Sequence, residues 1–135
     1  MTEGAMAGQS IYPSFRYKDA PGAIAWLVEA LGFVVRDVHE ADDGTVAHAE
    51  LSFGSELIML GSERDDAYSG RTGGGFTYVV VERDDVDALY DRAVSAGAEV
   101  LGELSEKDYG SRDFSVKDPE GNVWSFGTYR PAVPG

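Results

Sequence analysis

The sequence predicts an α+β fold in which one βαβββ unit occurs twice in tandem. Two amphipathic helix patterns, each preceded by one segment of β-forming residues and followed by three more, are the first observation. The second is that similar turn residues separate the segments in both halves. A polar, glycine-rich connector lies between the halves. We therefore expect one domain over residues 11–130, with repeat one at 11–62, a linker at 63–75 and repeat two at 76–130.

Repeat one begins with the β-rich segment 11–17, after which the signals of a helix follow. Asp19 stands at the N-cap position and Pro21 lies just inside the expected helix. Gly32 supplies a C-terminal stop. The apolar residues between them recur at the spacing of one helix face: Ile24, Leu27, Val28 and Leu31.

Three strands should complete repeat one, at residues 33–39, 46–53 and 56–60. A turn at residues 42–44 joins the first two, and Gly54-Ser55 can close a tight hairpin between the last two. This hairpin places Leu51 opposite Ile58 as an apolar pair beneath the helix.

Repeat two shows the same order. A strand at 76–82 precedes a helix capped by Asp84 and ended by Gly97, and strands follow at 99–104, 111–117 and 122–128. The apolar face of that helix consists of Val86, Leu89, Tyr90 and Ala93. The turn at residues 118–121 has proline second and glycine fourth, which is typical of a type I turn closing a hairpin.

The charge restricts the choice of partners. Acidic residues number 24 against 11 basic ones, a formal net charge of −13. Such a chain repels phosphate backbones and anionic lipid, so we expect no nucleic-acid and no membrane partner. The excess either serves solubility or favours a cationic ligand. The polar residues 1–10 predict a flexible lead-in, and the lack of cysteine fits the reducing cytoplasm, which is the expected location.

Three segments resemble a known family. They are residues 19–33 (DAPGAIAWLVEALGF), residues 118–126 (DPEGNVWSF) and residues 86–98, which end in AGA before a strand. In this order and spacing the chain from Ile11 to Tyr129 resembles the glyoxalase/bleomycin-resistance/dioxygenase (vicinal-oxygen-chelate) superfamily. The resemblance implies two mixed sheets forming a half-barrel with a ligand trough, with the helices on the outer face. It also implies a homodimer.

Metal-dependent members of that family place His or Glu ligands on the first and last strands of each repeat. The corresponding positions in this chain are Tyr12, Met59, Phe76 and Ser125. None of these is a usual ligand for a divalent ion at an oxygen- or imidazole-rich site. The resemblance is therefore to the metal-free branch, and we expect neither a metal nor a cofactor.

Strand alternation identifies the side chains that should face the trough. The predicted ligand-binding residues are Tyr12, Ser14, Arg16, His48, Glu50, Met59, Phe76, Tyr78, Asp113 and Ser125. Phe76 and Tyr78 are candidates for stacking on a planar or cationic ligand. Arg16 can clamp a carboxylate or pair with Glu50 or Asp113.

His48 and Glu50 lie two apart on one strand and so share a face. They can be solvated, contact a ligand, act as a base and its neighbour, or start a displaced metal site with Asp113. His39 should simply be exposed. Trp26 and Trp124 fit core positions better than ligand platforms, although Trp26 lies off the centre of its helix face and can reach a subunit interface.

Three functions remain. The first is a metal-independent protein of the bleomycin-resistance type that confers antibiotic resistance by sequestering an aromatic or cationic ligand. The second is a glyoxalase-related lyase or isomerase that uses His48 and Glu50. The third is a regulatory domain whose trough is plugged by Tyr12, Met59 and Phe76. The sequence does not identify the ligand, nor whether the trough is completed within one chain or across a dimer.

Overall fold

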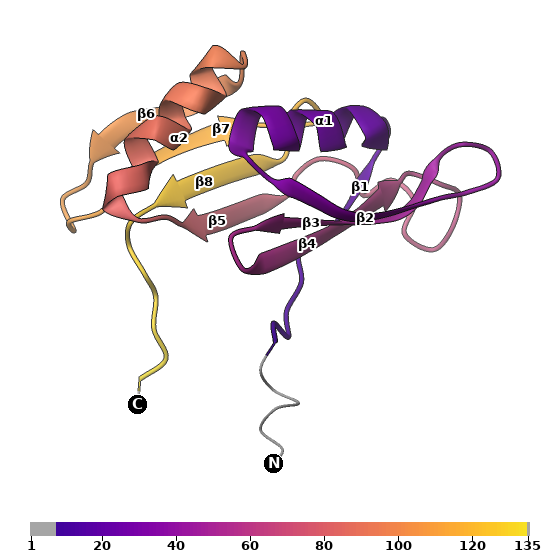
Figure 1. Ribbon diagram of the computed structural model, residues 1–135, viewed down its shortest axis with the longest axis horizontal. Coiled ribbons are helices and arrows are strands. Elements are labelled where there is room, and N and C mark those ends of the chain that lie inside the picture. Colours follow the sequence, from indigo (N-terminus) through magenta and orange to yellow (C-terminus); the bar gives the residue numbers. More distant parts are fainter. Residues whose placement is uncertain (1–7, 135) are drawn as a thin grey trace.

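The computed structural model describes residues 8–134, which form two helices and two four-stranded mixed sheets (Figure 1). The two sheets do not close into a barrel, and the chain follows the order βαβββ twice. The predicted α+β class and the tandem repeat are confirmed. Most of the predicted lead-in, residues 1–7, lies outside the described residues.

The first repeat forms one sheet with its helix. Its elements are β1 (Ser14–Tyr17), α1 (Ala20–Leu31), β2 (Val34–Glu40), β3 (Val46–Phe53) and β4 (Glu56–Ser62). The strand expected from residue 11 begins only at Ser14. Pro13 has no N–H to donate, and its carbonyl accepts a single bond of 2.9 Å from the Met59 N–H before regular pairing starts. Tyr12 therefore precedes the strand.

The second repeat forms the other sheet. Its elements are β5 (Phe76–Val80), α2 (Arg83–Ser95), β6 (Glu99–Glu106), β7 (Arg112–Lys117) and β8 (Val123–Gly127). The prediction that Asp84 caps α2 was wrong. The helix begins at Arg83 with Glu82 at the N-cap and no side-chain cap. Asp84 and Asp85 instead lie in its first turn, where the partial positive charge of the helix end stabilises them.

The strand order is the same in both sheets. It is β1-β4-β3-β2 in the first and β5-β8-β7-β6 in the second. In each sheet the first and last strands of the repeat pair in parallel and the others pair antiparallel. Leu51 lies opposite Ile58, as expected from the hairpin. This register decides which side chains share a face.

Both ends of α1 are fixed by specific contacts. The Asp19 carboxylate accepts a bond of 3.0 Å from the Gly22 N–H, and Gly32 ends the helix with a left-handed φ of 80°. Arg92 of α2 donates from its guanidinium to the carbonyls of Glu29 and Val28, at 2.9 Å each. A side chain of the second repeat thus donates to carbonyls in the last turn of the first helix.

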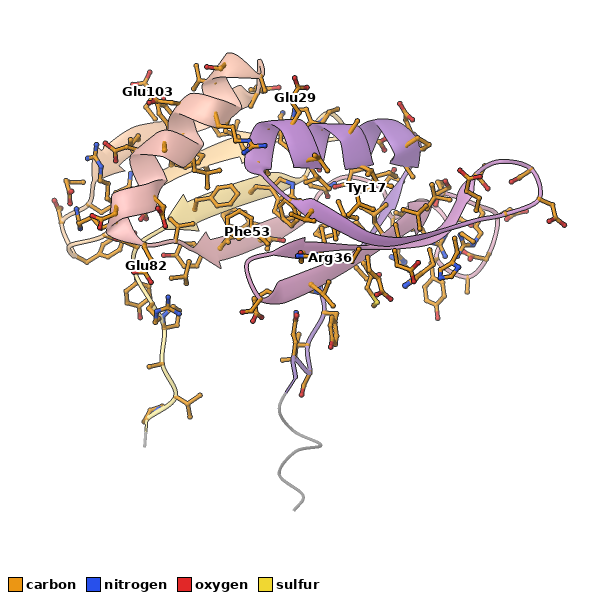
Figure 2. The ribbon with its side chains drawn as sticks, viewed as in Figure 1. Tyr17, Glu29, Arg36, Phe53, Glu82 and Glu103 are labelled. Atoms are coloured by element: carbon orange, nitrogen blue, oxygen red, sulfur yellow. The ribbon has the colours of Figure 1, made fainter. Side chains whose placement is uncertain are left out.

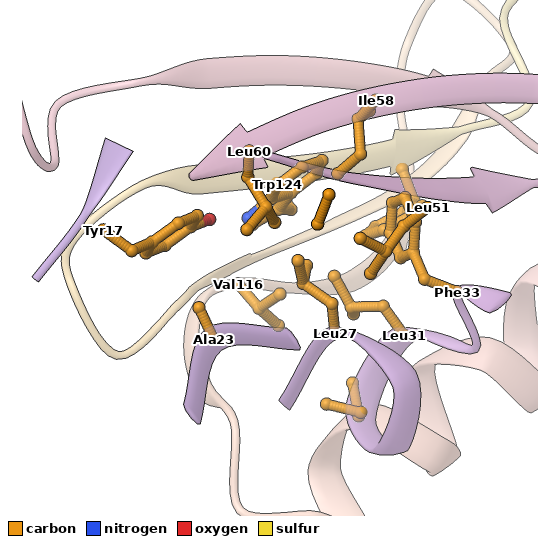
Figure 3. Close-up of a cluster of buried hydrophobic side chains, with 14 of the residues drawn as sticks. Tyr17, Ala23, Leu27, Leu31, Phe33, Leu51, Ile58, Leu60, Val116 and Trp124 are labelled. Atoms are coloured by element: carbon orange, nitrogen blue, oxygen red, sulfur yellow. The ribbon is translucent and has the colours of Figure 1, made fainter. Parts of the chain in front are cut away.

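One hydrophobic core passes through both repeats. The two helices lie on the same side of the two sheets (Figure 1), and the buried residues form a single cluster. Figure 3 shows Leu27 and Leu31 of α1 together with Val116 and Trp124 of the second sheet. Trp124 is completely buried, which confirms its predicted core position. Trp26 is half-buried at the margin of this core.

The hairpin turn after β7 contains the most heavily bonded buried carboxylate. Asp118 Oδ1 accepts bonds from the backbone N–H groups of Glu120 and Asn122, both at 3.0 Å. Its Oδ2 accepts from Tyr17 Oη at 2.6 Å, Asn122 Nδ2 at 3.0 Å and Trp124 Nε1 at 3.2 Å. Burial, and then the bond to Asp118, raise the pKa of the Tyr17 hydroxyl. Asp118 therefore joins β1 to the last hairpin.

Candidate functional site

The open faces of the two sheets, defined here as the faces turned away from the helices, carry most of the predicted site. Phe15, Tyr17, Leu51 and Leu60 pack into or against the core, so their strand neighbours lie on the other side. The first sheet carries Ser14, Arg16, His48, Glu50 and Met59, and the second carries Phe76, Tyr78, Asp113 and Ser125. Tyr12, 37% exposed, lies just before β1.

On the first sheet, His48 and Glu50 are in contact. His48 Nε2 lies 2.9 Å from Glu50 Oε2, and both side chains are partly open to solvent. A second pair repeats this arrangement on β2, where His39 Nε2 lies 2.9 Å from Asp37 Oδ2. The two imidazoles face each other across the strands with ring centres 6.4 Å apart. His39 is exposed, as predicted.

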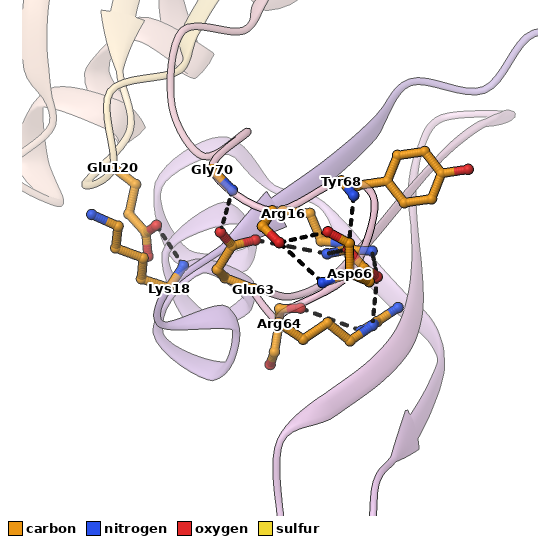
Figure 4. A network of polar contacts seen from close by, with 10 residues as sticks. Arg16, Lys18, Glu63, Arg64, Asp66, Tyr68, Gly70 and Glu120 are labelled. Carbon is orange, nitrogen blue, oxygen red and sulfur yellow. Dashed lines mark hydrogen bonds and ion pairs between the residues drawn. The ribbon is translucent and has the colours of Figure 1, made fainter.

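Arg16 does not pair with Glu50 or Asp113, so that expectation was wrong. Its guanidinium lies 2.7 Å from Asp66 and 3.7 Å from Glu63 (Figure 4). The linker comes close because β4 extends to Ser62 and the Glu63 N–H bonds to the Tyr17 carbonyl. The bond from Arg16 lowers the pKa of the Asp66 carboxyl. Arg16 therefore holds the linker onto the sheet.

On the second sheet, the predicted residues differ sharply in exposure. Phe76 is 73% exposed, whereas Asp113 is only 8% exposed even though it lies on the open face. Tyr78 lies beside Ser125 in the parallel register and donates its hydroxyl to the Tyr129 carbonyl at 2.6 Å. Alternation alone predicted the face of Asp113 but not its burial, because the covering groups come from the β6–β7 loop.

A groove of about 920 Å³ runs between the two repeats, along β5 and the β3–β4 hairpin. Its apolar walls include Phe33, Phe53, Leu57, Ile58, Val79 and Leu89. Figure 2 shows Phe53 between the hairpin and β5, and its ring lies 5.4 Å from that of Phe33 and 5.8 Å from that of Phe126. Its size suits a drug-sized molecule.

A few polar groups lie among these apolar walls. Thr77 and Tyr78 of β5 are among the lining residues, and Glu82 and Arg130 form an exposed ion pair at 3.6 Å. The Gln9 side chain also lines the groove and pairs with both backbone groups of Leu57, at 2.6 and 2.9 Å. A mainly apolar cleft with a small number of polar groups is typical of ligand sites.

Only Tyr78 among the ten predicted residues lines this groove. The sequence did not identify the remaining residues that line the groove, because the groove forms where two distant segments approach each other. Phe53 and Leu57 are ordinary hairpin residues in the sequence, and Val79 is an ordinary strand residue. No local pattern marks them as neighbours across the two repeats, so no signal in one sequence was available to find them.

The arrangement of two mixed sheets with a groove between them agrees with a family comparison. The model of the Glyoxalase/Bleomycin resistance protein/Dioxygenase superfamily matches residues 11–126. The chain belongs to this superfamily. Among solved structures, TioX from Micromonospora sp. ML1 is similar, with a TM-score of 0.78 and 30% identity, covering 91% of this chain and 100% of that one.

Other relatives extend the comparison. The uncharacterized protein Rv0887c of Mycobacterium tuberculosis is 31% identical over 87% of this chain and 73% of its own. A glyoxalase/bleomycin resistance protein/dioxygenase family enzyme from Burkholderia phytofirmans has a TM-score of 0.64 at 21% identity, covering 86% of this chain and 94% of that one. At this identity the likeness concerns the fold alone. Neither helix in residues 8–134 is long and apolar enough to cross a membrane.

The four positions that the family resemblance assigns to metal ligands carry side chains that do not suit a metal. Met59 lies beside Ser14 in the register, and Ser125 lies beside Tyr78. Met59 offers a thioether and Tyr12 and Ser125 offer hydroxyls, while Phe76 offers no donor atom at all. Within residues 8–134, no three His, Cys, Asp or Glu side chains gather in a way that could hold a metal ion.

Proposed function

We propose that this member of the superfamily is a metal-independent small-molecule binding protein of the bleomycin-resistance type. It holds an amphipathic aromatic or cationic ligand and lowers the free concentration of that ligand, as an antibiotic-sequestering protein does. The observation that carries the proposal is the groove between the repeats. Its aromatic and aliphatic walls supply hydrophobic contact, and its few polar and charged residues supply orientation.

The side chains at the expected metal-ligand positions support a function that does not depend on a metal. The family resemblance assigns the ligand positions of metal-dependent members to Tyr12, Met59, Phe76 and Ser125, and these side chains are poor ligands for a hard divalent ion. Binding must then come from apolar burial, aromatic contact and electrostatics. The net charge of −13 favours ligands with a positive group, since a strongly negative protein attracts cations over several ångströms.

A neutral aromatic dye tests this proposal. We expect Nile red to bind saturably and to gain fluorescence, because the groove removes it from water. Leu57→Glu places a charge on the half-buried groove wall and should weaken binding by about tenfold, since a carboxylate beside an apolar ligand loses hydration. Fluorescence titration measures both affinities. Extensive dialysis against EDTA should leave the affinity unchanged.

Leu101→Glu is the matched control. It makes the same change at an exposed leucine of β6 that does not line the groove, and it should bind the dye as the parent does. Absence of saturable binding to the parent chain would contradict the proposed function. Equal weakening by both substitutions would show that the groove is not the site. Loss of binding after EDTA treatment would contradict independence from metal.

We also propose that the protein is a homodimer. Within residues 8–134, the outer edge of β5 and most of the outer edge of β1 are not paired with another strand. The exposed aromatic residues Tyr12 and Phe76 lie beside these edges. Open edges and exposed aromatic surface favour association. Sedimentation equilibrium at micromolar concentration should give twice the 14.5 kDa mass of the chain. A single species at the mass of the monomer would refute this.

A further inference from the structure

The carboxylate of Asp113 is buried on the open face of the second sheet. The residue is 8% exposed, and its oxygens accept bonds from Ser111 Oγ and, at 2.9 Å, from Tyr109 Oη. Backbone approach makes the site tight, because a Cβ on Gly127 would overlap Asp113 and lie 2.7 Å from Tyr78 Oη. Asp113 and Tyr78 therefore meet above the same glycine of β8.

Among the described residues, this carboxylate has no cation beside it. Within residues 8–134 no Lys, Arg or His nitrogen comes within 4.0 Å of Asp113. The adjacent Arg112 instead bonds Asp87 at 2.8 Å. A buried carboxylate whose bonds come only from hydroxyls is under-compensated, because a charge removed from water is best balanced by an opposite charge.

Three tyrosines cluster near Asp113: Tyr109 bonds its carboxylate, Tyr78 Oη lies above the same glycine, and Tyr129 contacts Tyr109. Tyr109 and Tyr129 lie edge to face, with ring centres 6.2 Å apart, and Tyr78 donates to the Tyr129 carbonyl at 2.6 Å. Contact with Asp113 raises the pKa of the Tyr109 hydroxyl. Aromatic faces around a negative charge attract alkylammonium groups through the ring quadrupole as well as through charge. The cluster therefore offers both elements of an ammonium site.

Tyr109 covers the carboxylate from the solvent side. It lies in the β6–β7 loop, is 66% exposed, and is held by a turn in which the Gly110 N–H bonds to the Lys107 carbonyl at 2.9 Å. Figure 1 places this loop at the same end of the second sheet as the end of β8, which leads to Tyr129. Rotation of one exposed side chain would open Asp113 to a ligand without moving a strand.

The geometry points to a subsite for an alkylammonium group, formed by Asp113, Tyr78, Tyr109 and Tyr129, with the Tyr109 hydroxyl occupying the place of the cation in the absence of ligand. The inference rests on the proposed small-molecule binding function and specifies the cationic part of the ligand. Tyr78 also lines the groove, so an amphipathic ligand can place its apolar body there and its charged group at Asp113.

Choline and its uncharged isostere 3,3-dimethylbutan-1-ol test the subsite by NMR titration of the full chain. We expect choline to shift the amide signals of residues 109–113 and 127–129 saturably, and the isostere to leave them unchanged. Asp113→Asn should weaken choline binding by about tenfold. Tyr109→Phe should strengthen it by a few-fold, because no hydroxyl then has to be displaced from the carboxylate.

Asp108→Asn is the matched control, since it removes one negative charge from an exposed residue of the same loop. It should change choline affinity less than twofold. Equal effects of Asp113→Asn and Asp108→Asn, or equal binding of choline and the isostere, would overturn the subsite. Nile red distinguishes the two proposals: dye binding without choline binding refutes the subsite alone, whereas absence of dye binding refutes the groove.

Discussion

Replacing Asp118 with alanine is expected to lower the free energy of unfolding by about 3–5 kcal/mol. The substitution leaves the Tyr17 hydroxyl, the Trp124 indole N–H and two backbone N–H groups without their acceptor in a buried region. Each buried donor left unpaired costs about 1–3 kcal/mol, although part of this is recovered when water enters. Urea denaturation followed by circular dichroism measures the change.

Two further variants make the Asp118 result specific. Asp65→Ala removes an exposed carboxylate and should stay within about 0.5 kcal/mol of the parent. Tyr17→Phe removes one donor to Asp118 while keeping the ring, and should cost about 1–2 kcal/mol. A loss below about 1 kcal/mol for Asp118→Ala would mean that these contacts do not stabilise the fold.

Leu27→Ala is expected to cost about 2–5 kcal/mol, because the truncated side chain leaves a cavity in a densely packed core. Leu27 is completely buried on α1 and belongs to the same core cluster as Val116 of the second sheet (Figure 3). The cavity would therefore separate surfaces contributed by both repeats. The same urea titration measures the loss, and thermal unfolding should show a lower Tm with one transition.

Leu101→Ala provides the comparison for Leu27. It deletes the same atoms from a leucine of β6 that is 50% exposed, so it should cost less than about 1 kcal/mol. Equal losses at the two positions would contradict the placement of Leu27 in a core shared by both repeats.

Local signals in the sequence were sufficient to predict the fold. The Asp19 cap, the Gly32 stop and the apolar face around Leu27 each act over a few residues, and the structure places all three as expected. The core position expected for Trp124 on β8 is also correct. These predictions succeeded because helix ends and strand faces depend on near neighbours in the chain.

The site was less predictable because it depends on contacts between distant segments. The partner expected for Arg16 was wrong, since nothing in the linker composition indicated that Glu63 and Asp66 would fold back onto β1. The groove joins the β3–β4 hairpin to β5, and only the packing of the two repeats creates it. The ten predicted ligand-binding residues remain a prediction, although strand register places nine of them on the open faces.

The contact from Arg92 to the end of α1 has a consequence for how such a chain can arise and be divided. A βαβββ unit is the repeating unit of the sequence, but its core and the end of its helix are completed by residues of the other repeat. Cutting the chain at the linker would remove the guanidinium from the carbonyls of Val28 and Glu29 and expose the core around Leu27. We therefore expect each repeat, expressed without the other, to be less stable than the whole chain.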